Sequence, residues 1–334
     1  MSRKKANAAW ADKSNLPQAY PQGVEWDINI PHINLLTLLD QTIVRFSRRP
    51  AIDFMDKKIT YEEFGQMVNK AAKGLQDMGV RPGQKVGLYM PNTPYYPIMF
   101  FAALRAGASV VNSSPLYTQE ELENQCKDSG TDVMVTTELK EFYDKTVKLR
   151  TDGHVNQVVQ CPIYDMLPTF KSYGYRMLKR KEIASPVTSD SAHGLNNTRR
   201  FVTFGELVDN AGDYTAINSA PDSPAVFQYT GGTTGVPKGA MLSHFNLVAN
   251  TYQIQEYFGT NPKRENPYEA LHEGREKVLA AIPYFHVFGM MVAMVGSMKL
   301  GGELIIMPNP RDTKELLKTI EKKQPTLFPA VPRL

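Results

Sequence analysis

The sequence is poor in cysteine and in excess charge of either sign. Its two cysteines, Cys126 and Cys161, lie far apart and match no metal-binding or redox spacing. This argues against a disulfide framework and favours a reducing, cytoplasmic environment. Lysine and arginine exceed aspartate and glutamate by only 38 − 34 = 4 residues. That excess is too small for a dedicated nucleic-acid-binding protein, and no DNA or RNA motif is present, so no nucleic-acid partner is expected.

Long apolar runs are almost absent as well. The N-terminus is basic and then polar, without the apolar core of a signal peptide. Residues 278–298 are apolar apart from His286 and Ser297, and they approach the length of about 20 residues that a membrane-spanning helix needs. Because Pro283 and Gly289 interrupt this run, we expect a buried strand, a loop and a buried helix. A membrane-embedded carrier built around the run is the alternative.

The composition of the sequence and its alternation of predicted strands and helices are typical of a globular α/β protein. Its 334 residues are 42% apolar and 22% charged, which suits about two packed domains. Strands are expected at 51–54, 58–60, 85–90, 108–112, 132–136, 155–161, 225–229, 277–281 and 303–307. Helices are expected at 34–46, 60–79, 93–107, 118–130, 138–150, 243–257 and 312–323, with a further helix ending at Gly301. This alternation predicts layered, parallel-rich sheets flanked by helices.

The same pattern divides the chain into three segments. Residues 1–26 are irregular and rich in proline, glutamine and asparagine, and we expect an arm lying over the body. Residues 27–220 are expected to form a first α/β subdomain, in which the alternation lapses over 162–220 as an insertion would. The alternation resumes over 221–334, which is expected to form a second, partial α/β subdomain.

Residues 229–239 are the most informative segment, and they follow a predicted strand. They read YTGGTTGVPKG. Glycines let backbone N–H groups approach an anion closely, threonine hydroxyls add donors, and Lys238 adds a positive charge. Because Lys238 stands between Pro237 and Gly239, the segment is not a Walker A loop, and it also lacks the G-x-G-x-x-G dinucleotide pattern. The pattern predicts a polyphosphate site, with a flexible connector as the less favoured interpretation.

Residues 229–246 resemble the signature loop of the adenylate-forming (ANL) superfamily, which includes acyl-CoA synthetases, luciferases and peptide-synthetase adenylation domains. Residues 283–289, PYFHVFG, resemble the second core motif of acyl-CoA synthetases. Residues 20–24 and 166–181 are similar to segments of bacterial long-chain fatty acid–CoA ligases. The resemblance covers about residues 20–334, and it implies the fold of the N-terminal large domain of that superfamily.

The resemblance implies ATP-dependent activation of a long-chain fatty acid. In this family the carboxylate attacks the α-phosphorus of ATP to give an acyl-adenylate and pyrophosphate, and the thiol of coenzyme A then displaces AMP. ATP, Mg2+, coenzyme A and a fatty acid are therefore the expected cofactors and substrates. The implied phosphate ligands are Thr230, Gly231, Gly232, Thr233, Thr234, Gly235 and Lys238, with Thr230 also as a contact for magnesium.

Lys238 and His286 are the expected catalytic residues. Lys238 would act through its charge, and His286 would form a wall or gate of the acyl pocket, since attack by a carboxylate requires no general base. The implied substrate contacts are Tyr284, His286, Phe288 and Gly289. A histidine among apolar residues is otherwise usually a core residue, and the apolar helix that follows could line an alkyl tunnel or simply pack in the core.

Residues 166–181 combine aromatic and apolar side chains with five lysines and arginines. Such a segment can lie on an anionic membrane surface, so we expect peripheral contact with the inner face of a membrane. A solvated charged face is the alternative.

The family's later elements have no match in the sequence: a Y-G-x-T-E motif, a ribose-binding aspartate, a hinge and a C-terminal lid with a lysine. Ala330 also stands where the resemblance implies glycine. We therefore expect an incomplete N-terminal portion without the lid, with little or no turnover by itself. A non-catalytic nucleotide- or acyl-binding fragment and a ligase for another carboxylic acid are the alternatives, and the sequence leaves the oligomeric state open.

Overall fold

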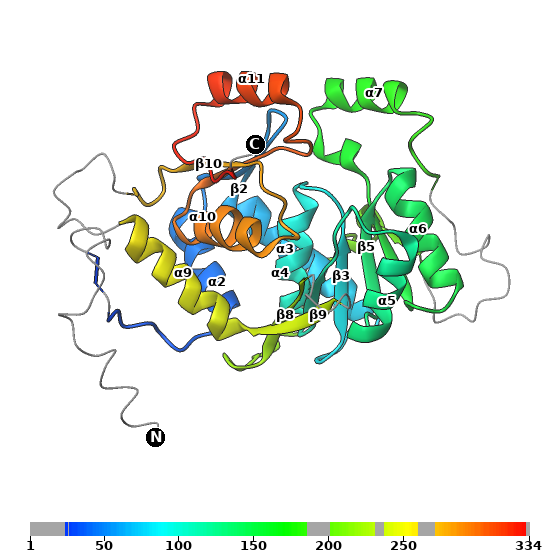
Figure 1. Ribbon diagram of the computed structural model, residues 1–334, viewed down its shortest axis with the longest axis horizontal. Helices are drawn as coiled ribbons and strands as arrows, with labels where there is room; N and C mark the ends of the chain where they lie inside the picture. Colours follow the sequence, from blue (N-terminus) through cyan, green and yellow to red (C-terminus); the bar gives the residue numbers. More distant parts are fainter. Residues whose placement is uncertain (1–23, 26, 186–200, 231–236, 260–270, 332–334) are drawn as a thin grey trace.

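The structure is a computed structural model that describes residues 24–25, 27–185, 201–230, 237–259 and 271–331. Within these residues, two sheets lie with helices packed around and between them (Figure 1). The expected arm at residues 1–26 lies outside the described residues except for Val24 and Glu25. The α/β class predicted from the sequence is confirmed.

The larger sheet has seven strands in the order β7-β6-β5-β3-β4-β8-β9. Its strands are β3 (Lys85–Tyr89), β4 (Ser109–Asn112), β5 (Val133–Thr137), β6 (Gln157–Cys161), β7 (Phe201–Thr203), β8 (Pro224–Thr230) and β9 (Lys238–Ser243). All neighbouring strands pair in parallel except β8 and β9. The central strands are buried along almost their whole length, because a parallel sheet is covered on both faces.

The smaller sheet has four strands in the order β10-β11-β1-β2. Its strands are β1 (Pro50–Phe54), β2 (Lys57–Thr60), β10 (Lys277–Ala280) and β11 (Glu303–Ile306). β1 pairs in parallel with β11, and only the edge strand β2 is antiparallel to its neighbour. Both sheets thus take strands from either side of residue 220, so the sheet boundaries do not coincide with the subdomain boundary expected from the sequence.

Helices pack against both sheets. They are α2 (Leu35–Phe46), α3 (Tyr61–Asp77), α4 (Tyr95–Arg105), α5 (Gln119–Ser129), α6 (Lys140–Thr151), α7 (Thr169–Leu178), α8 (Phe204–Leu207), α9 (His244–Phe258), α10 (Gly296–Lys299) and α11 (Thr313–Lys323), with the 3-10 helix η2 (Ile163–Met166) and the π-helix η4 (Gly289–Val295). One buried cluster joins α2, α3 and α4 to strands of both sheets. A second joins α5 and α6 to the other face of β5 and β6, because successive strand residues face opposite sides.

The predicted helix starts rest on side-chain caps that the structure contains. The hydroxyl of Thr60 accepts a hydrogen bond from the amide of Glu63, whose carboxylate accepts from the amide of Thr60 in return. Thr118 and Glu121 form the same reciprocal pair at the start of α5. A capping box of this kind satisfies amides that the first turn leaves without a helical partner.

Two expectations from the sequence need correction. The strand β9 was not expected, since the sequence predicts a loop running directly into the helix at residue 243. The stretch 162–220, expected to be an irregular insertion, contains η2, α7, α8 and the strand β7, and β7 extends the larger sheet beside β6. The expected strand, loop and helix over 278–298 are confirmed as β10, a loop, and η4 with α10. No helix among the described residues is long and apolar enough to span a membrane.

Candidate active site

The glycine- and threonine-rich segment joins the two strands of an antiparallel hairpin. Thr230 ends β8 and Lys238 begins β9, and the two are cross-strand partners. Both are exposed to solvent. Because β8 runs parallel to β4, the hairpin loop emerges at the carboxyl edge of the sheet, where α/β folds commonly bind ligands. Residues 231–236, and with them the predicted Gly231, Gly232, Thr233, Thr234 and Gly235, lie outside the described residues.

The base of this hairpin is closely packed. Gly239 lies opposite Tyr229, and a Cβ atom on Gly239 would come within 2.9 Å of Cζ of the tyrosine ring. The hydroxyl of Tyr229 donates to Oδ2 of Asp128 in α5 at 2.5 Å. Burial and the hydrogen bond with Asp128 raise the pKa of Tyr229 well above its ordinary value. The strand ends that flank the glycine- and threonine-rich segment are therefore closely packed.

The His286 loop, defined here as residues 281–288, connects β10 to η4. The side chain of His286 is exposed, and that of Phe288 is 37% exposed. Tyr284 is fully buried against the ring of Tyr96, with ring centroids 5.5 Å apart. Of these predicted substrate contacts, the structure therefore exposes His286 and Phe288 and buries Tyr284.

Close packing against the backbone of the loop explains why position 289 is glycine. A Cβ atom at this position would lie 2.2 Å from the carbonyl oxygen of Pro283 and 2.9 Å from that of Ile282. No side chain fits there without a shift of the backbone. The family resemblance implied Gly289 as a substrate contact, and its backbone contact with the loop offers a structural reason for glycine in the motif.

Asn92, which follows β3, holds the first half of the His286 loop. Its amide nitrogen donates to the carbonyl oxygens of Ala280 and Ile282 at 3.2 and 2.9 Å. Its amide oxygen accepts from the backbone N–H of Tyr284 at 2.8 Å. Sequence reasoning missed Asn92, and the only signal for it is a polar residue placed shortly after a buried strand.

An apolar cavity of about 290 Å3 lies beside the same loop. Phe288 of the His286 loop and Val292 of η4 line it, and α9 and the segment 327–330 line it from the other sides. Ala330, which stands where glycine was expected, belongs to that lining. The cavity suits an apolar group such as an alkyl chain, because its walls offer dispersion contacts and few polar partners.

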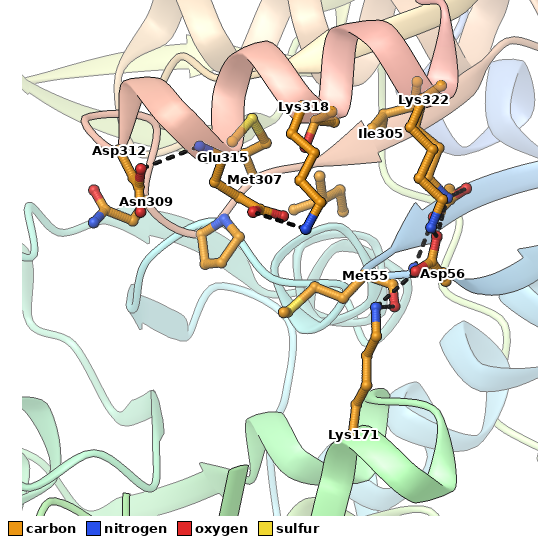
Figure 2. A pocket seen from close by; sticks show the side chains of 15 residues that line it. Met55, Asp56, Lys171, Ile305, Met307, Asn309, Asp312, Glu315, Lys318 and Lys322 are labelled. Carbon is orange, nitrogen blue, oxygen red and sulfur yellow. Dashed lines mark hydrogen bonds and ion pairs between the residues drawn. The ribbon is translucent and has the colours of Figure 1, made fainter. Parts of the chain in front are cut away.

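A second, polar cavity of about 170 Å3 lies between α11, the turn joining β1 to β2, and Lys171 of α7 (Figure 2). Its charged groups pair with one another. Asp56 contacts Lys171, Lys322 and Lys323 at 2.6–2.8 Å, and these hydrogen bonds lower the pKa of Asp56 far below its ordinary value. Since its charges are compensated internally, this cavity is not the candidate active site.

Magnesium was expected near Thr230. Among the described residues, one group of three potential metal ligands lies close together: Glu123, Asp152 and His154. It includes no residue of the β8–β9 hairpin. The ammonium group of Lys148 already pairs with both of its carboxylates. A hydroxyl such as that of Thr230 remains chemically suitable for Mg2+, which is usually held through substrate phosphates and few protein ligands.

Comparison with known proteins agrees with these features. The family model for AMP-binding enzymes matches residues 39–334. A long-chain-fatty-acid–CoA ligase of Bacillus subtilis is 34% identical over 320 residues, covering 94% of this chain and 53% of the relative. The corresponding ligase of Escherichia coli O157:H7 is 32% identical over 318 residues, covering 91% and 52%. The chain therefore spans about half the length of the curated relatives it matches.

A solved structure shares the fold. The crystal structure of a long-chain-fatty-acid–CoA ligase from Archaeoglobus fulgidus superposes with a TM-score of 0.71 at 24% identity, covering 94% of this chain and 54% of that one. Because the family model covers most of the chain, including the hairpin and the His286 loop, this chain belongs to the AMP-binding enzyme family.

Proposed function

We propose that this chain provides the phosphate- and acyl-binding part of an AMP-forming fatty acid–CoA ligase. The fatty acid carboxylate attacks the α-phosphorus of ATP and pyrophosphate leaves. The sulfur of coenzyme A then attacks the acyl carbon, the thiol proton is lost, and AMP leaves. The observation that carries the proposal is the hairpin whose mouth is formed by Thr230 and Lys238 at the carboxyl edge of the sheet.

The roles proposed for the hairpin follow from charge. The ammonium group of Lys238 and the hydroxyl of Thr230 would hold the β- and γ-phosphates, together with residues 231–235. Mg2+ would neutralise the same oxygens, with Thr230 as a protein contact. Such fixed donors stabilise charge in the transition state and position phosphorus in line with the attacking carboxylate.

The cavity beside Phe288 would receive the acyl chain, and His286 would form part of its entrance. The apolar lining favours a fatty acid. A ligase for another acid is the second candidate, since a 4-coumarate–CoA ligase of Humulus lupulus is 29% identical over 310 residues. A part of the enzyme that binds nucleotide or acyl group without turnover is the third candidate, and the exchange measurement below distinguishes it.

The test is binding of Mg–ATP and acid-dependent exchange of pyrophosphate into ATP, measured on this chain. We expect Lys238→Ala to weaken Mg–ATP binding at least about tenfold, the size of one lost charge-assisted contact. Lys314→Ala removes an exposed lysine of α11 as the control. Palmitate and 4-coumarate serve as alternative acids. Equal binding by both variants contradicts the assignment of the hairpin, and binding without exchange supports the fragment.

Contact with the inner face of a membrane through residues 166–181, in a cytoplasmic location, belongs to the same proposal. It is supported by α7, which has no buried residue. Phe170 and Leu178 are 90% and 86% exposed, and Tyr173 and Met177 project beside them. Residues 166–181 contain five lysines and arginines and no aspartate or glutamate. An apolar helix face flanked by cations is typical of helices that lie on anionic lipid.

Sedimentation with phosphatidylglycerol vesicles tests this contact. We expect the double change Phe170→Ser and Leu178→Ser to lower vesicle binding at least about fivefold, since both side chains would leave the lipid. Leu116→Ser, at another residue that is 71% exposed, should leave binding unchanged. Equal sedimentation of the two variants, or no sedimentation of the wild type, would rule out α7 as the lipid-binding surface.

A further inference from the structure

Three buried polar side chains form a chain of hydrogen bonds that ends on the His286 loop. The hydroxyl of Tyr96 donates to Oδ1 of Asn112 at 2.8 Å. Nδ2 of Asn112 donates to Oε1 of Gln228 at 2.9 Å, and Nε2 of Gln228 donates to the carbonyl oxygen of Phe285 at 3.0 Å. All three side chains are buried. We call Tyr96, Asn112 and Gln228 the amide relay.

The relay has a fixed direction. Because Tyr96 donates to the oxygen of Asn112, the nitrogen of Asn112 faces Gln228, and the nitrogen of Gln228 then faces the loop. A buried amide with both ends bonded resists rotation, since turning it would leave a donor and an acceptor unpaired. Nδ2 of Asn112 also lies 3.3 Å from the sulfur of Met290 in η4. The relay thus contacts the chain on both sides of His286.

One member of the amide relay, Gln228, lies in β8, the strand that ends at Thr230. Asn112 in β4 and Gln228 in β8 are partners in adjacent parallel strands. Gln228 and Thr230 are two residues apart in β8, so their side chains share one face about 7 Å apart along the strand. Gln228 therefore contacts both parts of the proposed site. Its backbone belongs to the phosphate-binding hairpin, and its side chain donates a hydrogen bond to the His286 loop.

We infer that Gln228 is a positioning residue that sets the distance between the phosphate-binding hairpin and the His286 loop. The functional meaning of that distance rests on the proposed function, since it separates the proposed phosphate and acyl sites. Binding at one site then favours the loop arrangement that the other requires, which gives positive coupling between nucleotide and fatty acid.

Gln125 supplies a matched control. It is buried like Gln228. Its amide nitrogen donates to the backbone carbonyl of Asn112 at 3.0 Å, and its amide oxygen accepts from the hydroxyl of Ser113 at 2.7 Å. Gln125→Met and Gln228→Met thus each replace a buried glutamine and remove two hydrogen bonds. Only Gln228→Met removes the hydrogen bond to Phe285. Methionine keeps the length of the side chain in both.

Hydrogen–deuterium exchange of the amides of residues 284–290 tests the positioning without any ligand. We expect Gln228→Met to speed this exchange about tenfold over wild type, and Gln125→Met to change it less than about twofold. Gln228→Glu is the second variant: it keeps an acceptor for Asn112 and loses the donor to Phe285, so it should speed exchange in the same segment. Exchange that is equal in the Gln228 and Gln125 variants overturns the inference.

The coupling is measured by titrating palmitate with and without Mg2+ and α,β-methylene ATP, an analogue that cannot release pyrophosphate. Wild type and Gln125→Met should bind palmitate at least about fivefold tighter with the analogue present, the low end of common couplings, and Gln228→Met should lose this difference. A difference that persists in Gln228→Met contradicts the coupling. A wild type that binds neither ligand contradicts the proposed function instead, and the exchange result then decides the positioning role.

Discussion

Gly289 illustrates how a single residue of a motif can be required for packing. Its backbone lies against the carbonyl groups of Ile282 and Pro283, at distances that no Cβ atom tolerates. Backbone atoms cannot move aside as the end of a flexible side chain can. The close approach joins η4 to the loop that carries His286, so the constraint acts on the candidate site although Gly289 itself is buried.

We predict that Gly289→Ala lowers the free energy of unfolding by about 1–3 kcal/mol, the usual cost of overpacking. Gly174→Ala in α7 is the control, because a Cβ atom there meets nothing within 4 Å. That change should be neutral or stabilise by about 0.5–1 kcal/mol, since alanine is the better helix former. Denaturant unfolding measures both. A Gly289→Ala protein as stable as wild type would contradict the close contact.

At the scale of elements, the sequence predicts well what is local. Capping boxes at Thr60 and Thr118 placed helix starts correctly, because the two partners stand three residues apart in one segment. The sequence did not predict β9. Its side chains do not alternate regularly between buried and exposed positions, and the strand forms by pairing with the edge of β8. The sequence also missed β7, three residues long and partly buried, which is too short to show a period.

What the sequence could not predict depends on neighbours distant along the chain. The alternation predicted parallel strands, but it did not place β1 beside β11 or β4 beside β8. Gln228 lies beside Asn112 because of the second pairing, and it also contacts Phe285, which is 57 residues further along the chain. A local pattern was therefore enough to propose Thr230 and Lys238 as site residues, whereas it gave no indication of the side chains that hold the His286 loop.

At the scale of the whole molecule, two buried groups make stability depend on pH in opposite directions. Burial raises the pKa of Glu138 from 4.5 to about 7, against a hydrogen bond from the amide of Ile163. Asp165 of η2 and Tyr175 of α7 also face this carboxyl group. Burial lowers the pKa of His244 from 6.5 to about 4. The first group ties the end of β5 to η2, and the second begins α9.

The direction in which each group changes the free energy of unfolding with pH follows from whether the native or the unfolded state binds its proton. Between about pH 4.5 and 7 the native state holds the proton of Glu138 and the unfolded state does not, so the free energy of unfolding falls as pH rises. Between about pH 4 and 6.5 the unfolded state holds a proton on His244 that the native state lacks, so the free energy rises with pH. Each slope approaches about 1.4 kcal/mol per pH unit, and near pH 5–6 they offset each other.

The change Glu138→Gln separates the contributions of Glu138 and His244, because glutamine keeps an acceptor for the amide of Ile163 and cannot ionise. We predict that its free energy of unfolding rises with pH between about 5 and 6.5, where His244 alone acts, and exceeds that of wild type by about 2–3 kcal/mol above pH 7.5. Glu141→Gln, at an exposed position of α6, should follow the wild-type curve. Urea unfolding across this range measures the difference, and parallel curves for Glu138→Gln and wild type would show that Glu138 is already ionised in the native protein near pH 5.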